Sequence, residues 1–155
     1  MLDFFLTLEN QPAVVAFSES LFAYPVVQGL HVLSLALAVG LLALADLRLA
    51  RVLFTAYPAK VVVAGLRPWF IGGYALMFVT GVLLFLPKAS ALYASPLFWT
   101  KMALIALAGV NALYFELNYR QGHDAPESLR PKLAGLASLG LWVAVIVTGR
   151  LLAYF

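Results

Sequence analysis

The sequence predicts an all-α fold class, namely an integral membrane four-helix bundle with additional interfacial helices. The chain has 155 residues, of which 64% are hydrophobic and 11% are charged, a composition far from that of an ordinary soluble domain. Its apolar residues are gathered in four segments that each reach the roughly 20 residues a helix needs to cross a bilayer. Prolines and short polar stretches separate these segments. We therefore expect a single transmembrane domain over residues 1–155.

Helix start and stop signals bound the expected spans. Pro68 stands at the first-turn position of the second span, and Pro87 lies at its end. The third span opens on Ser95 and Pro96, a capping residue followed by a first-turn proline, and the fourth span follows Pro131. The expected spans cover approximately residues 21–45, 68–87, 96–118 and 132–154.

Two segments outside the spans are suited to the membrane surface. Residues 1–20 mix aromatic and aliphatic side chains with acids around a break at Asn10-Gln11-Pro12, so we expect two short interfacial helices there. The basic and partly apolar stretch 47–67 suits a surface helix with a break at Tyr57-Pro58. The first residues lack the basic start of a signal peptide, and we expect them to remain in the mature protein.

Basic residues are distributed unevenly between the expected loops. Seven lie in or beside the loops that follow spans one and three, namely Arg48, Arg51, Lys60, Arg67, Arg120, Arg130 and Lys132. Because cytoplasmic loops carry the excess of lysine and arginine, these two loops are expected in the cytoplasm. We therefore expect a multi-pass protein of a bacterial inner membrane with both termini in the periplasm.

Composition also excludes several classes of function. The chain has no cysteine, so it forms no disulfide, no thiolate metal site and no covalent haem attachment. No basic run is interleaved with aromatic side chains, so no nucleic acid partner is expected. Membrane lipid is the expected partner, with a redox partner or further copies of the chain as open alternatives.

Proton-coupled transport has little support in the sequence. Asp46 and Glu116 lie near the expected cytoplasmic ends of spans one and three. Pairing with Arg48, Arg67 or Arg120 is expected to account for both acids, because charges inside a membrane protein are usually paired.

One histidine stands out inside the first expected span. His31 shares a helix face with Tyr24, Gln28, Ser34 and Ala38, which follow three- and four-residue steps. Lipid does not satisfy polar groups, so this face is expected to point into the bundle. An ionisable group at membrane depth is a functional-site hypothesis by default, and imidazole is the commonest metal ligand. The alternative is a structural histidine.

In that alternative, His31 is hydrogen-bonded to Tyr74 or Thr80 of span two. Such polar contacts between membrane helices are common.

Two cations are expected in the same outer half of the bundle. At about 1.5 Å of rise per residue, His31 lies roughly 13–15 Å below the outer end of span one and Lys101 roughly 7 Å below that of span three. Arg150 lies near the outer end of span four. Unpaired inward cations indicate an anionic ligand, and the alternative is that both reach the phosphate headgroups of lipid. His123 lies in the opposite loop and is expected to be solvated.

Iron porphyrin satisfies both parts of this pattern. His31 would ligate the iron, while Lys101 and Arg150 would pair with the propionates. Trp142 lies in the middle of its span and is the best aromatic candidate for the pocket. Met77, at comparable depth on span two, is a candidate second axial ligand, with Met102, Lys101 or an open position as alternatives. We therefore expect a haem b cofactor.

Several short motifs carry a resemblance over roughly residues 21–119. They are Leu30-His31 followed by Gly40, Gly81-Val82-Leu83-Leu84 at the end of span two, and Phe98-Trp99-Thr100-Lys101-Met102 at the start of span three. The pattern resembles the HemJ-type membrane protoporphyrinogen IX oxidases, and the layout is also similar to the copper-resistance D membrane domain. Closer still is the similarity of residues 30–49, Arg67-Pro68-Trp69 and Lys101-Met102 to a bacterial four-span membrane family of unknown function.

The HemJ resemblance implies functional roles for His31 and Lys101 and a bound b-type haem. This chain departs from that family's pattern at Thr100 and at Phe115 or Glu116, where histidines are usual, so the oxidase activity is the less expected part. The expected function is a b-type haem protein acting in electron transfer or porphyrin-linked redox chemistry, with enzyme activity left open. The alternatives are a cofactor-free membrane assembly subunit and a copper-handling membrane domain, although one membrane histidine and three methionines are a poor set of copper ligands.

Overall fold

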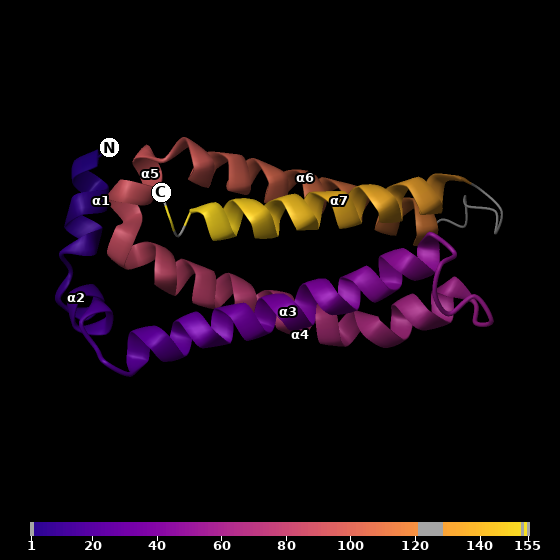
Figure 1. Ribbon diagram of the computed structural model, residues 1–155, viewed down its shortest axis with the longest axis horizontal. Helices are drawn as coiled ribbons and strands as arrows, with labels where there is room; N and C mark the ends of the chain where they lie inside the picture. The colour runs from indigo at the N-terminus through magenta and orange to yellow at the C-terminus, as the bar shows by residue number, and fades with distance from the viewer. Residues whose placement is uncertain (1, 121–128, 153, 155) are drawn as a thin grey trace. The chain divides into compact units, whose positions relative to one another are not determined.

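The chain is built from helices joined by short connections (Figure 1). A computed structural model describes residues 2–120, 129–152 and 154, with the side chains of residues 116 and 118–120 left out. Its elements are α1 (Leu2–Glu9), α2 (Pro12–Ser18), α3 (Ala23–Leu49), α4 (Ala59–Phe85), the 3-10 helix η1 (Leu86–Lys88), α5 (Ala89–Ala94), α6 (Pro96–Arg120) and α7 (Leu129–Leu151). No strand occurs among these residues.

Four segments are long and apolar enough to cross a membrane. They are Ala23–Leu49, Ala59–Ala94, Pro96–Phe115 and Leu129–Leu151. Many large apolar side chains on them are exposed in the protein itself, among them Leu33, Phe78 and Val143, and a bilayer would cover such surface. The predicted all-α fold class of a membrane protein with four spanning helices is therefore confirmed.

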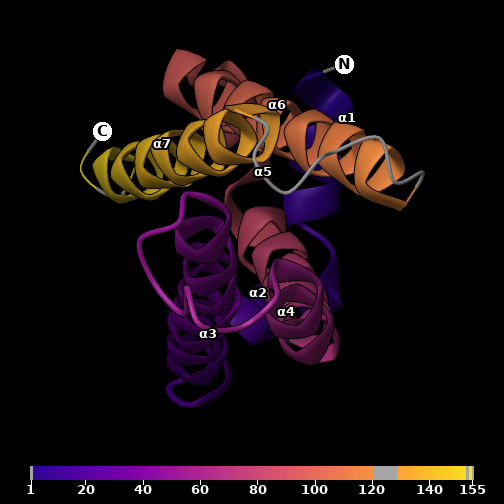
Figure 2. The ribbon, with the colours of Figure 1, turned by 90° about the vertical axis from the view of Figure 1, so that its right-hand side faces the viewer.

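The helices group into two compact units, which are described separately. Unit 1 comprises residues 1–40 and 69–96, and unit 2 comprises residues 41–68 and 97–155. The division falls inside two helices, because α3 continues past Gly40 and α4 begins before Trp69. Within unit 2, α6 and α7 run side by side (Figures 1 and 2), and the amide of Asn111 on α6 donates to the Ala134 carbonyl on α7 at 3.1 Å.

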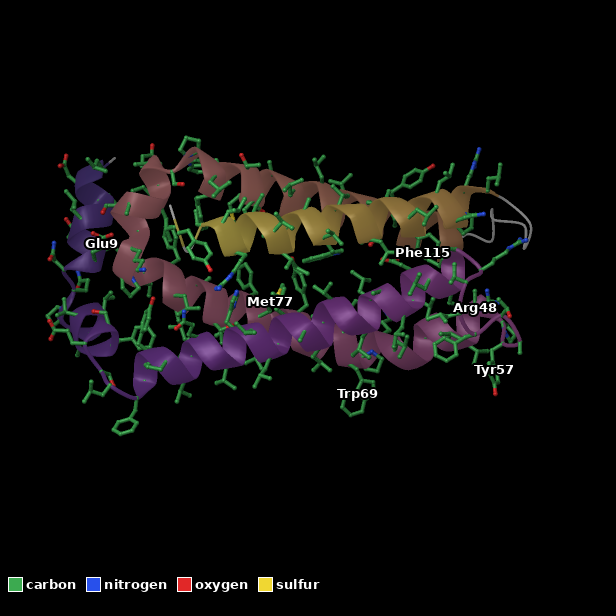
Figure 3. The ribbon with its side chains drawn as sticks, viewed as in Figure 1. Glu9, Arg48, Tyr57, Trp69, Met77 and Phe115 are labelled. Atoms are coloured by element: carbon green, nitrogen blue, oxygen red, sulfur yellow. The ribbon has the colours of Figure 1, made fainter. Side chains whose placement is uncertain are left out.

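In unit 1, the two predicted N-terminal helices are present and separated at the predicted break. Gln11 has an extended backbone ahead of Pro12, the first residue of α2. The carboxylate of Glu9 at the end of α1 accepts hydrogen bonds from the backbone N–H of Ser90, at 2.7 Å, and from its hydroxyl, at 2.9 Å (Figure 3). Phe5 and Tyr93 stack beside this contact with ring centroids 4.6 Å apart. These contacts fasten α1 to α5.

Two helix starts differ from the sequence-based expectation. The expected break at Tyr57-Pro58 is present, but α4 then runs from Ala59 straight through Pro68, so the expected surface helix and span two are one helix. A proline inside a helix removes one backbone hydrogen bond, which long apolar helices tolerate. In the same way α7 begins at Leu129 and includes Pro131 in its first turn, where backbone N–H groups lack helical partners in any case. Pro96, by contrast, begins α6 as predicted.

Small residues make the close contacts between helices. In unit 1, a Cβ added to Gly73 on α4 would lie 3.2 Å from the backbone nitrogen of Ala38 on α3. In unit 2, a Cβ on Gly135 of α7 would lie 2.8 Å from the carbonyl oxygen of Asp46 on α3. Membrane helices approach this closely where glycine, alanine and serine face each other. The neighbouring side chains Ser34, Ala38 and Ser138 are accordingly buried.

Candidate functional site

His31 is held by a hydrogen bond between α3 and α4 in unit 1. Its Nδ1 lies 2.9 Å from the hydroxyl oxygen of Thr80. Thr80 is buried, with 3% of its surface exposed, whereas His31 is half-buried. Thr80 was one of the two partners that the sequence analysis named for a structural histidine, and this contact between the two helices is present.

The surroundings of Thr80 assign the proton on the imidazole. The Thr80 hydroxyl oxygen lies 2.7 Å from the carbonyl of Leu76 and 3.1 Å from that of Met77. A carbonyl only accepts, so the single hydroxyl hydrogen of Thr80 is donated to its own helix. With the hydrogen placed there, the Thr80 oxygen is available to accept from His31, and this arrangement favours the tautomer with the proton on Nδ1. In the neutral imidazole, the lone pair is therefore on Nε2.

Gly81 provides the space for the histidine ring. A Cβ added to Gly81 would lie 3.2 Å from Cε1 and 3.7 Å from Nδ1 of His31. The first of these distances is shorter than ordinary van der Waals contact, so any side chain at this position displaces the ring or the helix. Thr80 and Gly81 together determine the position of His31.

Other residues of the predicted polar face have different surroundings. Ser34 is buried, but its hydroxyl donates to the carbonyl of His31 at 3.0 Å, on its own helix. Tyr24 is half-buried and packs against Phe17 of α2, with ring centroids 5.6 Å apart. Gln28 is exposed, so the expectation that it points inward is wrong. The inward face of α3 in unit 1 therefore begins at His31 and continues through the buried Ser34 and Ala38.

Met77 lies in the packed interface between α3 and α4. Its side chain is 8% exposed, and it shares a face of α4 with Gly73 and Thr80 (Figure 3). The close approach of Gly73 to Ala38 and of Gly81 to His31 joins the two helices above and below Met77. This packing favours a core role for Met77, and its role as an axial ligand stays a prediction.

The other predicted site residues, Lys101, Trp142 and Arg150, belong to unit 2. Lys101 is half-buried, and its Nζ and Cε would lie 3.5 Å from a Cβ at Gly149, so its side chain reaches α7 beside Arg150. The guanidinium of Arg150 is exposed; it donates to the hydroxyl of Tyr154 at 2.8 Å and lies over that ring. Trp142 is 7% exposed. The side chain of Lys101 therefore meets α7 at Gly149, the residue next to Arg150.

Tryptophans 69 and 99 differ from Trp142 in their surroundings. Their exposed fractions are 67% and 52%, and Trp69 projects away from the ribbon (Figure 3). This is the expected arrangement for tryptophans that contact lipid at an interface.

Sequence analysis missed the most unusual polar residue of unit 2. Asp46 is 5% exposed, and a hydrogen bond joins its carboxyl to Ser138 of α7. Its second oxygen, Oδ2, has no hydrogen-bond partner among the described residues. Pairing with Arg48, Arg67 or Arg120 was expected; the Arg48 guanidinium instead donates from Nε and Nη2 to the carbonyl of Tyr57 in the following loop (Figure 3), and the side chain of Arg120 lies outside the described residues. The signal that could have identified the site is Gly135 and Ser138 on one face of α7.

Among the described residues, no group of three or more histidine, cysteine, aspartate or glutamate side chains is arranged to hold a metal ion. The copper-handling alternative therefore gains no support. His123, expected to be a solvated loop residue, lies outside the described residues.

The comparison with known proteins finds one family. The model of a family of unknown function, DUF6644, matches residues 19–155, so α1 and α2 precede the match. No curated protein and no solved structure matches the chain. The match agrees with the expected resemblance to a membrane family of unknown function, and it supports neither the HemJ-type oxidases nor the copper-resistance D domain. Since it covers most of the chain, the protein belongs to the DUF6644 family.

Proposed function

We propose that this protein is a b-type haem-binding membrane protein in which Nε2 of His31 is an axial ligand of the iron. The observation that carries the proposal is the hydrogen bond between His31 and Thr80. Histidines that bind metals almost always donate their other ring N–H to a neighbouring acceptor, which orients the ring and raises its basicity. Thr80 would have that role here, with its own hydrogen donated to the α4 backbone.

The position of the histidine also agrees with this role. His31 lies on a candidate membrane span and is half-buried, where an ionisable residue without function is costly. Gly81 leaves room for the ring at the place where Thr80 holds it, and a ligand held in one position loses less entropy on binding. A bound haem would supply one-electron transfer or porphyrin-linked redox chemistry.

The decisive experiment is the visible absorption spectrum of protein purified from membranes, oxidised and after reduction with dithionite. We expect a Soret band and the reduced α and β bands of a b-type haem. His31→Ala should remove this spectrum or change its ligand signature while the protein remains helical by circular dichroism. Fold and ligand must be measured together, because a bound haem itself stabilises the folded state.

Two outcomes would overturn the proposal. If His31→Ala retains an unchanged haem spectrum, the histidine is not the ligand. If the folded wild-type protein, supplied with haem during expression, carries none, the hydrogen bond to Thr80 joins the two helices and has no cofactor role. Co-purification of that haem-free protein with another membrane protein would then favour the assembly-subunit alternative.

A further inference from the structure

The Asp46 carboxyl is a buried acid with incomplete hydrogen bonding. It lies in the last turn of α3, within a candidate membrane span. Its neighbours Ala45, Leu49 and Ala50 are all less than a tenth exposed, so this side of α3 is covered by protein. Across from it, Gly135 contacts the Asp46 backbone and Ser138 its carboxyl. Asp46 is therefore enclosed where α3 and α7 touch.

Only one of the two carboxyl oxygens is satisfied. Oδ2 has no hydrogen-bond partner in the described part of the chain, so the bond with Ser138 involves Oδ1. A buried carboxylate accepts several hydrogen bonds or pairs with a cation, and leaving a charged oxygen unpaired away from water costs several kcal/mol. A protonated carboxyl avoids most of this cost, because it carries no charge.

Among the side chains that the structure describes, no charge takes the place of a proton on Oδ2. The basic residues of unit 2 on α3, on the loop after it, on α4 and in the first turn of α7 are Arg48, Arg51, Lys60, Arg67, Arg130 and Lys132. None of them donates to Oδ2, and Arg48 is engaged by the Tyr57 carbonyl. The C-terminal end of a helix also carries partial negative charge, which disfavours an anion in the last turn of α3.

A metal cation does not fit the site either. Hard cations take six or more oxygen ligands, whereas the side chains that meet here provide one carboxyl and one hydroxyl. Among the described residues there is also no cluster of three metal-ligating side chains. A proton, by contrast, needs only one carboxyl oxygen.

We propose that Asp46 is a proton-binding site of this protein, with its carboxyl protonated while α3 and α7 are in contact. The proton is taken up from water onto the carboxylate and returned to water when the contact opens. The loop that follows α3 begins one turn further on, so the path to the aqueous phase is short. The proposal does not depend on haem, and its test needs no cofactor.

The test is infrared spectroscopy of the full-length protein in lipid nanodiscs at neutral pH. We expect the carbonyl stretching band of one protonated carboxyl per chain, and a downward shift of that band in D2O. Asp46→Asn should abolish the band. Glu9→Gln is the matched control and should leave it unchanged, because Glu9 receives hydrogen bonds on both of its oxygens from Ser90.

A second variant keeps the test conclusive if Asp46→Asn does not fold. Ser138→Ala leaves the acid in place and removes its hydrogen-bond partner, so the carbonyl band should move to higher frequency. A purely structural role for Ser138 would not move a carboxyl band. If the wild-type protein has no D2O-sensitive carboxyl band at neutral pH, or if the band is unaffected by both substitutions, Asp46 is not protonated and the proposal is wrong.

Discussion

Nδ1 of His31 on α3 lies 2.9 Å from the Thr80 hydroxyl oxygen on α4, and in the tautomer in which Nδ1 donates to this oxygen the lone pair is on Nε2. Thr80→Val keeps the shape of the side chain and removes the acceptor. We expect haem affinity to fall about 10- to 100-fold, the usual effect of losing the outer partner of a metal-bound histidine. Haem titration of the apoprotein measures it. Thr80→Ser keeps the hydroxyl and should bind nearly as the wild type does; equal losses in both variants would contradict this role of the hydroxyl.

Two glycines on α4 allow a matched test of ring position. Gly81→Ala would place a methyl group 3.2 Å from Cε1 of His31, whereas Gly72 has no atom within 4 Å of its added Cβ. We expect Gly81→Ala to alter the haem absorption and electron paramagnetic resonance spectra, and Gly72→Ala to leave both unchanged. Identical spectra for all three proteins would show that the imidazole tolerates displacement.

The prediction that Lys101 and Arg150 pair with the haem propionates stays a prediction. In the described part of the chain no carboxylate pairs with either one; Arg150 bonds Tyr154, and Lys101 lies against Gly149. Lys101→Gln or Arg150→Gln should weaken haem retention or shift its reduction potential, because each removes a positive charge. Redox titration of both variants checks this. Unchanged occupancy and potential would assign the two side chains to lipid headgroups.

The contact between α3 and α7 should be sensitive to a single methyl group. Gly135→Ala would place a Cβ 2.8 Å from the Asp46 carbonyl oxygen, while Gly140, further along the same helix, has open space. The overlap is with backbone, which does not rotate away, so we expect a loss of about 1–3 kcal/mol in stability. Thermal unfolding in detergent compares Gly135→Ala with Gly140→Ala, and the latter should resemble the wild type.

Membrane orientation is open to direct measurement, because the chain has no cysteine. Two single-cysteine variants report on opposite sides of the membrane. One replaces Tyr57, whose side chain is 59% exposed in the loop after α3, and the other replaces the exposed Gln11. With both termini in the periplasm, an impermeant thiol reagent added to intact cells should label Gln11→Cys and not Tyr57→Cys. The reverse labelling would invert the predicted topology.

Much of the fold was predictable from local signals, and the errors have a common cause. Pro68 and Pro96 carry the same helix-start signal, yet only Pro96 begins a helix. Residues 59–67 are themselves helix-compatible and precede Pro68 without a break, whereas Ser95 has an extended backbone before Pro96. A local rule does not distinguish these cases, since the outcome depends on whether the preceding turn is also helical.

The candidate site was predictable where the position of a side chain depends on the periodicity of a single helix. The steps from His31 to Ala38 predict a shared inward face, and Thr80 was one of two residues of span two named as partners for a structural His31. Asp46 was misinterpreted because nearby arginines in the sequence indicate pairing, while the actual environment depends on which face of α3 meets α7. Gln28 failed for a similar reason, since it follows the same three- and four-residue steps on α3 and is nevertheless exposed.

The backbone contacts at Gly73, Gly81 and Gly135 also bear on how the family can diverge. Substitution of these three glycines is constrained, because a neighbouring helix or the histidine ring already occupies the space that a methyl group would need. Gly72 and Gly140 have open surroundings and are free to drift to other apolar residues. In members of the DUF6644 family, glycine retained at the first set and lost at the second would mark proteins that keep these helix contacts. A member that carries a larger residue opposite Asp46 would have had to separate α3 from α7.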